Sequence, residues 1–401
     1  MNRLYSRAIP AALSLAIVAV IVTLVTRRQF YTEAMLSAFF ACSLLGAAIL
    51  HFAVAPRRDY QFVGGCTAVL AAIDYGGLGF PHGATIFVPL LSLTGLSSLM
   101  VFGVRTAWSQ GKARGLYLRA FIPAILFVVS EYAASDLHRI ASWLHPKTWD
   151  LYLYSFDASL GIQLSFVLGR MFHAMPWFRV LSLIGYIGLA VPVAVVAAGL
   201  LRARSERVLP AIVAFVITGP VGVIFYNLFP ACGPKFVFQG QFPSSPLTTS
   251  QAARLLLEPI SLNGIRNAIP SLHMAWVLLA WWNSRGLSVW IRALAMFFVV
   301  FTVTSTLGTG EHYLVDLVVA FPFAIMVQAL ADYTLPLRDP QRWRPLLAGL
   351  LMTLAWMGAL RFANRLWWVS PLVGFVAALS TVLASIYLFP AHARDAAASQ
   401  K

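Results

Sequence analysis

The stretch IRNAIPSLHMAWVLLAWW (265–282) begins with polar and titratable side chains and continues as an apolar run. Of the 401 residues in the chain, 60% are hydrophobic and only 11% are charged. Soluble domains carry about 25% charged residues. A soluble fold of this size could not bury so much apolar surface. We therefore expect an integral membrane protein in which this run is one of the membrane-spanning helices.

Apolar runs of about 20 residues are candidates for membrane-spanning helices. A shorter run near 61–77 contains Asp74 and two glycine pairs, and it is either a twelfth span or a re-entrant segment. The first long run ends in Arg27-Arg28 without a convincing cleavage site, so we expect an uncleaved span rather than a signal peptide. We predict an all-α, polytopic transmembrane helix bundle of about 11–12 spans. The long runs lie near 9–26, 34–55, 84–104, 117–136, 178–201, 208–229, 270–284, 290–308, 312–331, 345–361 and 367–388.

The charged loops predict how the bundle is oriented. Basic residues concentrate in the loops at 202–207, 283–292 and 337–344, which alternate with the loops at 230–269 and 309–311. Cytoplasmic loops are enriched in Lys and Arg. The first set is therefore expected inside and the second outside, and the localisation we expect is a bacterial inner membrane with the active site facing the periplasm or exterior.

The charge and the cysteines exclude other classes of protein. The formal net charge is +15, but the basic residues form short clusters between apolar runs and no nucleic-acid-binding motif is present. The three cysteines have no metal or redox spacing, so neither a disulfide scaffold nor a zinc site is predicted. No nucleic acid is expected as a partner, and the oligomeric state is not readable from the sequence.

Three regions are expected along the chain. N-terminal spans would occupy 1–116, a six-span catalytic core 117–332, and a C-terminal hairpin and tail 333–401. The segment WDLYLYSFDASLGIQLSFVLGRMF (149–172) has the pattern of an interfacial amphipathic helix on the outer side. In that position Asp150 and Asp157 would be solvated.

The opening stretch also predicts an anion site. Pro270 is expected to begin the helix, where its missing N–H costs nothing, with Ser271 beside it and His273 in the first turn. A helix N-terminus presents free N–H groups and a positive dipole end. Arg266 adds a guanidinium that can hold phosphate oxygens in a planar fork.

A second titratable group follows about forty residues later in GTGEHYLVDLVVAF (308–321). His312 is expected to open another span, and Asp316 at i+4 lies on the same helix face. An aspartate paired to one ring nitrogen fixes the tautomer and stabilises the imidazolium. Because the chain crosses the membrane twice between them, His273 and His312 are expected on the same face.

Two imidazoles beside a helix N-terminus that can bind an anion are suited to nucleophilic displacement at phosphorus. In such a reaction one His attacks and the other protonates the leaving oxygen. A single His near a span end is more often a packed residue, but the pair with Asp316 and Arg266 favours catalysis. Two His and one Asp could instead hold zinc or iron. The helix-start anion features would then have no role, so no metal and no cofactor are predicted.

PSLH (270–273) followed by GEHYLVD (310–316) resembles the second and third motifs of the type 2 phosphatidic acid phosphatase superfamily. The form of the motifs is most similar to the inositol phosphorylceramide synthase-like branch, and the resemblance covers roughly 120–332. It implies that His312 is the nucleophile, Asp316 its orienting partner and His273 the general acid. It also implies that Ser271 and nearby backbone N–H groups hold phosphate oxygens.

The chain departs from that family at two expected phosphate clamps. The first motif is Lys, six residues, then Arg-Pro, whereas Lys235 is followed after six residues by Phe242-Pro243. The third motif usually has Ser-Arg before its His, and here the positions hold Ser305 and Thr306. The predicted substrate-binding residues are Lys235, Arg266, Ser271 and Gly310.

We expect a lipid phosphatase or phosphotransferase acting at the outer leaflet through a phosphohistidine. Its partners would be the bilayer, a lipid phosphate, and water or an alcohol as acceptor. One alternative is a synthase that transfers a lipid headgroup to an alcohol. The other is a membrane transporter, but the sequence shows no internal repeat, and the His pair lies at a membrane edge rather than at mid-membrane.

Overall fold

The computed structural model describes residues 35–78 and 86–389, and for 77–78 and 130–139 it describes the backbone alone. The predicted first span at 9–26 lies outside the described residues. The described chain is almost entirely helical, as predicted. Its contacts divide it into two compact units, one formed by Met1–Tyr132 with Ala190–Leu209 and the other by Ala133–Leu189 with Pro210–Lys401. This division follows contacts alone, and the three regions divided at 116 and 332 stay a prediction.

In the first unit, α3 packs against α5 and α10, and α4 packs against α5. The α3–α5 contact is close at Gly95, where an added Cβ would lie 2.5 Å from the Cβ of Leu44. A buried polar cluster joins three of these helices, because His51 contacts both Ser98 and Asp59, and Arg105 pairs with Asp59. The helices of this unit are α3 (Ala38–Val54), α4 (Arg57–Leu78), α5 (Phe87–Trp108), most of α6 (Gly111–Leu144) and α10 (Ala190–Arg202).

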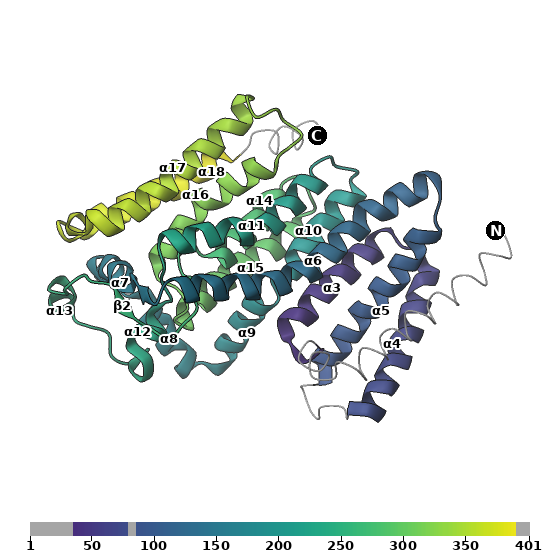
Figure 1. Ribbon diagram of the computed structural model, residues 1–401, viewed down its shortest axis with the longest axis horizontal. Helices are drawn as coiled ribbons and strands as arrows, with labels where there is room; N and C mark the ends of the chain where they lie inside the picture. The colour runs from purple at the N-terminus through teal and green to yellow at the C-terminus, as the bar shows by residue number, and fades with distance from the viewer. Residues whose placement is uncertain (1–34, 79–85, 390–401) are drawn as a thin grey trace. The chain divides into compact units, whose positions relative to one another are not determined.

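In the second unit, α16 is the central helix. It packs against α14, α17 and α18, which lie beside it in Figure 1. It is apolar around its whole circumference, as a fully enclosed helix must be. A second layer forms where α15 packs against α8, α9 and α14. The helices are α7 (Asp150–Ser159), α8 (Leu164–Ala174), α9 (Pro176–Ile187), α11 (Val208–Leu228), α12 (Pro234–Phe238), α13 (Thr249–Ala253), α14 (Leu272–Asn283), α15 (Val289–Gly308), α16 (Leu314–Ala331), α17 (Pro340–Phe362) and α18 (Pro371–Leu388), with 3-10 turns η2 (Gln239–Gln241) and η3 (Asn364–Trp368).

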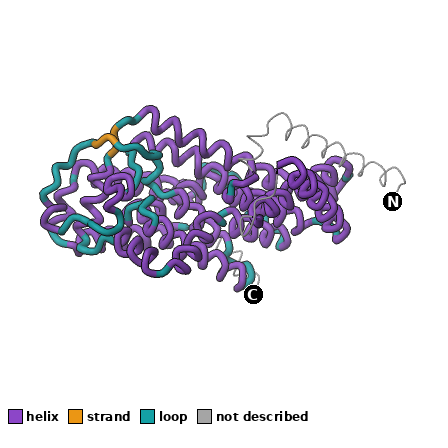
Figure 2. The backbone as a smooth tube through the Cα atoms, turned by 90° about the horizontal axis from the view of Figure 1, so that it is seen from below, coloured by secondary structure: helices purple, strands orange, loops and turns teal. Residues whose placement is uncertain are grey.

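Long loops gather around the pair of strands that Figure 2 draws in orange. A short antiparallel ribbon lies among them, in which β1 (Lys147–Thr148) pairs with β2 (Ile260–Ser261). The ribbon joins the end of α6 to the long connection between α11 and α14. It therefore fixes the segment that leads into the first of the two histidine motifs.

Six described helices are long and apolar enough to cross a membrane: α5, α11, α15, α16, α17 and α18. The number rises to eight if two bent pairs, α7 with α8 and α9 with α10, each form one span. These helices indicate an integral membrane protein and confirm the predicted all-α fold class. This number covers the described residues only, so the predicted span at 9–26 is not included, and α14 with 12 residues and α3 with 17 are shorter than the six.

The predicted amphipathic helix at 149–172 is wrong. The segment forms two helices, α7 and α8, which meet at 85°. Residues Tyr152 to Ser159 of α7 are buried, as are Asp150 and Asp157. Helix α7 is enclosed because α16, α17, α18 and η3 pack around it. The alternation of aromatic and polar residues therefore reflects packing on several sides rather than a membrane surface.

Candidate active site

His312 and Asp316 lie together at the start of α16. The Nδ1 atom of His312 is 3.3 Å from Oδ2 of Asp316, and both side chains are buried. The same carboxylate oxygen accepts the backbone N–H of Tyr313 at 2.8 Å. The helix begins at Leu314, so His312 precedes it by two residues rather than opening it as predicted. Asp316 therefore caps its own helix and holds the imidazole in one orientation.

Ser271 connects this pair to the start of α14. Its hydroxyl is 3.2 Å from Nε2 of His312 and caps α14 by accepting the backbone N–H of Met274. Its own backbone N–H donates to the carbonyl oxygen of Asp316 at 3.1 Å. The helix begins at Leu272, two residues after the predicted start at Pro270.

These contacts define the protonation pattern of His312. A carboxylate only accepts hydrogen bonds, so the Nδ1 atom facing Asp316 carries the proton. In the neutral ring the lone pair is then on Nε2, which faces the Ser271 hydroxyl at 3.2 Å. A neutral imidazole with Nε2 unprotonated is the form that can attack an electrophile.

His273 lies across from His312 in the first turn of α14. The two ring centroids are 6.5 Å apart, with the planes inclined by 65°. His273 stacks on Tyr186 of α9 at 4.1 Å and meets the edge of Trp276. Its ring is half-buried, and its orientation is set by these aromatic neighbours. The structure thus brings His273, His312, Asp316 and Ser271 together.

Asp157 of α7 holds the start of α16 from outside. Its carboxylate accepts the backbone N–H of Leu314 at 2.7 Å and that of Val315 at 3.2 Å. These are two of the N–H groups that have no partner within a helix. The carboxylate therefore fixes the segment that carries His312. The prediction that Asp157 is solvated is wrong.

Asp150 organises the neighbouring turn and is also buried rather than solvated. Its carboxylate accepts the backbone N–H groups of Cys232 and Gly233 and the hydroxyl of Tyr313. Burial raises the pKa of the Cys232 thiol to about 12, and the nearby Asp150 adds to this shift. The sequence does hold an indication that both aspartates are buried. They lie seven residues apart, so they share one face of a helix. Carboxylates in an apolar segment also need partners inside the protein.

Lys235 lies beside the loop before His312. Its Nζ atom pairs with the Glu311 carboxylate, and its backbone N–H donates to the carbonyl of Gly310 at 3.0 Å. Gly310 adopts φ +71°, where a side chain is strained, and its N–H donates to Leu307. Gly310 therefore shapes the loop, and both of its backbone polar groups already have protein partners.

Arg266 is held by backbone carbonyls rather than left open for a phosphate. Its Nε and Nη atoms donate to the carbonyl oxygens of His145, Gly264 and Pro146. The residue is only 4% exposed. These bonds use three of the five guanidinium donors and fasten the end of α6 to the loop before α14. The arrangement gives Arg266 a structural role that its sequence position did not reveal.

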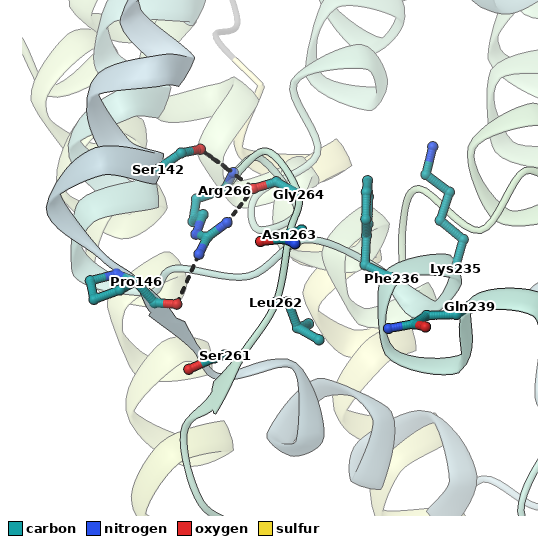
Figure 3. A pocket seen from close by; sticks show the side chains of 10 residues that line it. All are labelled: Ser142, Pro146, Lys235, Phe236, Gln239, Ser261, Leu262, Asn263, Gly264 and Arg266. Atoms are coloured by element: carbon teal, nitrogen blue, oxygen red, sulfur yellow. Dashed lines mark hydrogen bonds between the residues drawn. The ribbon is translucent and has the colours of Figure 1, made fainter.

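Lys235 and Arg266 both line a cavity of about 1060 Å³ (Figure 3). Lys235, Phe236 and Gln239 form one wall, and the loop from Ser261 to Gly264 forms the opposite one. None of the residues lining the cavity is a histidine, so the cavity does not contain the pair His273 and His312. Lys235 connects the two places, because it lines the cavity and pairs with Glu311, the residue before His312.

Residues 151–330 match the family model of the PAP2 superfamily. The matched segment contains all four residues that meet at His312, and it is the superfamily that the two motifs resemble. No curated protein and no solved structure matches the chain. The match and the apolar helices support a membrane phosphatase-like protein and, more generally, an enzyme. Among the side chains that the structure describes (residues 35–76, 86–129 and 140–389), no three of His, Cys, Asp or Glu come together as a metal site would require.

Proposed function

We propose that this chain is an integral membrane lipid phosphatase or phosphotransferase that works through a phosphohistidine on His312. The observation that carries the proposal is the arrangement of the two faces of that imidazole. Asp316 engages Nδ1, while Nε2 is turned toward Ser271 and the gap in front of His273. The match to the PAP2 superfamily supports the same class of reaction.

In the first half of the reaction, Nε2 of His312 attacks the phosphorus of a lipid phosphate. The bond from phosphorus to the leaving oxygen breaks, and its electron pair stays on that oxygen. His273, in its protonated form, donates a proton to this oxygen so that a neutral alcohol departs. The imidazole of His312 becomes cationic as the P–N bond forms, and the buried carboxylate of Asp316 stabilises that charge.

In the second half, the acceptor restores the enzyme. His273, now neutral, takes the proton from the acceptor hydroxyl while the acceptor oxygen attacks phosphorus. The P–N bond breaks, and its electron pair returns to Nε2 of His312. Water as the acceptor releases phosphate, whereas an alcohol gives a new phosphate ester, as in the inositol phosphorylceramide synthase-like alternative.

The phosphate would lie against the start of α14, where Ser271 and the first backbone N–H groups meet it. Lys235 supplies a positive charge that is accessible, because 36% of its side chain is exposed, and its partner Glu311 directly precedes His312. To reach a phosphate it must exchange Glu311 for the ligand. The loop charges favour the outer side of the membrane for this end of the bundle, where the lipid headgroup would enter.

The test uses the purified full-length protein in detergent. Phosphate release is measured from phosphatidic acid and from an isoprenyl diphosphate, and headgroup transfer is measured from a phospholipid donor with added alcohols. His312→Ala should abolish the activity. His173→Ala, which changes an exposed histidine on α8, is the matched control and should retain it.

Vanadate, which mimics phosphorus in the transition state, should inhibit the wild-type enzyme. If His312-dependent turnover occurs only when an alcohol is added, the protein is a synthase. If no donor is turned over and His312→Ala changes nothing, the catalytic proposal is wrong and the transporter alternative becomes the better explanation.

A further inference from the structure

The two histidines of the site are held by different kinds of contact. The imidazole of His312 is oriented by hydrogen bonds at both of its ring nitrogens. The imidazole of His273 is flanked by two aromatic rings, those of Tyr186 and Trp276. Trp276 lies on α14, the same helix as His273, whereas Tyr186 reaches it from α9. Tyr186 is therefore the ring that can fix His273 relative to the rest of the site.

The ring of Tyr186 lies almost parallel to the imidazole of His273. The two centroids are 4.1 Å apart, and the planes are inclined by only 17°. Aromatic pairs usually have centroids roughly 4.5–7 Å apart, so this stack is a close one. The nitrogens that donate and accept protons lie at the edge of an imidazole, whereas a stacked neighbour covers its face. The stack can therefore orient the ring without competing for the nitrogen that transfers a proton.

Helix α9 is fastened to α15 directly beside Tyr186. A Cβ added to Gly185 would lie 2.5 Å from the Cβ of Phe301, so only glycine lets the two helices come this close. About one turn earlier, the buried hydroxyl of Ser182 shares a hydrogen bond of 3.0 Å with the hydroxyl of Thr304. The backbone of Tyr186 is therefore held in place by α15.

The same part of α15 also positions the nucleophile. The carbonyl oxygen of Thr306 accepts the backbone N–H of His312 at 3.2 Å. Thr304 and Thr306 are two residues apart, so one turn of α15 holds both α9 and the loop that carries His312. The ring centroid of His273 lies 4.1 Å from that of Tyr186 and 6.5 Å from that of His312. This turn therefore relates the neighbour of one histidine to the position of the other.

We propose that Tyr186 is a positioning residue for proton transfer, whose ring holds the imidazole of His273 in the orientation that protonates the leaving oxygen. The inference rests on the proposed function, in which His273 is the general acid. An aliphatic alcohol needs that proton as its bond to phosphorus breaks, whereas a nitrophenol departs as a stable anion without it. Removal of the Tyr186 ring should therefore impair only substrates with the first kind of leaving group.

Two substrates with the same apolar tail separate this step from the others. Dodecyl phosphate and 4-dodecyl-2-nitrophenyl phosphate are assayed with the full-length protein in detergent, with an alcohol acceptor present. The values compared are those of kcat/KM, which report the steps up to departure of the leaving group.

Tyr186→Leu should lower kcat/KM for dodecyl phosphate about tenfold or more, as part of the roughly 10²–10⁴-fold that general acid catalysis contributes. For the nitrophenyl substrate it should leave kcat/KM within about twofold, because that leaving group needs no proton. Tyr186→Phe keeps the ring and should retain both activities. Tyr186→Met, which fills the space without a ring, repeats the test if Tyr186→Leu lowers the melting temperature.

Phe178→Leu is the matched control, because it removes another half-buried ring from the same helix. Among the described residues, the ring neighbours of Phe178 are Phe172, Trp177 and Phe301. Any loss that this variant causes should be equal for the two substrates.

A double variant tests whether Tyr186 acts through His273. His273→Asn alone should show the same dependence on the leaving group, and adding Tyr186→Leu to it should cause no further loss. The proposal is overturned if the two losses multiply, or if Tyr186→Leu affects both substrates equally or neither. Any of these results with turnover that still requires His312 refutes this inference alone. If turnover of neither substrate requires His312, the proposed function is refuted and the inference falls with it.

Discussion

Replacing Asp316 by Asn tests the proposed role of the carboxylate with little change in shape. Oδ1 of Asp316 has no hydrogen-bond partner among the described residues, so the amide nitrogen can take its place. The amide oxygen then replaces Oδ2 and keeps the contacts to His312 and to the backbone of Tyr313. The change therefore removes the negative charge and leaves the geometry nearly intact.

The size of the effect follows from the 3.3 Å separation between Asp316 Oδ2 and His312 Nδ1. For full charges at an effective dielectric constant of about 20, the attraction is about 5 kcal/mol. If half of the positive charge on the imidazole has developed in the transition state, about 2.5 kcal/mol is lost, which is roughly a 70-fold decrease in kcat. Substrate binding before charge develops should change much less, so KM should stay within a few-fold.

The assay is the initial rate of phosphate release from the best lipid donor, with kcat and KM measured separately. Asp332→Asn is the matched control, because Asp332 is a buried aspartate at the opposite end of the same helix. It should leave kcat within about twofold. A kcat for Asp316→Asn within threefold of the wild type, in a protein of unchanged melting temperature, would refute the charge-stabilisation argument.

Three further results are expected. Gly233→Ala should lower thermal stability and activity together, because φ at this glycine is +124° and the added Cβ would lie 2.3 Å from the carbonyl oxygen of Glu311. Gly240→Ala is the control and should change neither, because the space around Gly240 is open. Cys232 is tested in a variant whose other two cysteines are replaced by serine. It should resist maleimide at pH 8 in the folded protein and react after denaturation, because burial raises the pKa of its thiol to about 12 and keeps it protonated. Asp157→Asn should lower the melting temperature by several degrees and reduce kcat, because it replaces one of the two carboxyl oxygens that accept backbone N–H groups at the start of α16, where each hydrogen bond contributes about 0.5–1.5 kcal/mol. A melting curve identical to that of the wild type would contradict this.

The sequence was sufficient to predict the parts of the site that depend on local spacing. The pairing of His312 with Asp316 follows from four residues of chain, and the likeness of PSLH and GEHYLVD to one superfamily agrees with the segment that the family model matches. Apolar composition likewise was enough to predict an all-α membrane protein. These features need no knowledge of the tertiary fold.

Contacts between distant segments could not be predicted in the same way. Asp157 contacts Leu314 across 157 residues of sequence, and no pattern in either segment announces the other. The amphipathic pattern of α7 was misread because period alone does not tell a membrane surface from a polar lining inside the protein. Arg266 lies close to the motif in sequence, but its donors are directed to carbonyls at 145 and 146, which only the fold brings near.

The carboxylate of Asp157 at the start of α16 has a consequence for the direction from which an anion is attracted. Two helices begin at the site, and each has a positive dipole end. At α16 two of the first N–H groups already donate to the carboxyl group of Asp157 from α7, so they are not open to an anion from the gap. At α14 the capping group is the neutral hydroxyl of Ser271. Under the proposed function, a phosphate would therefore approach the start of α14 rather than the start of α16.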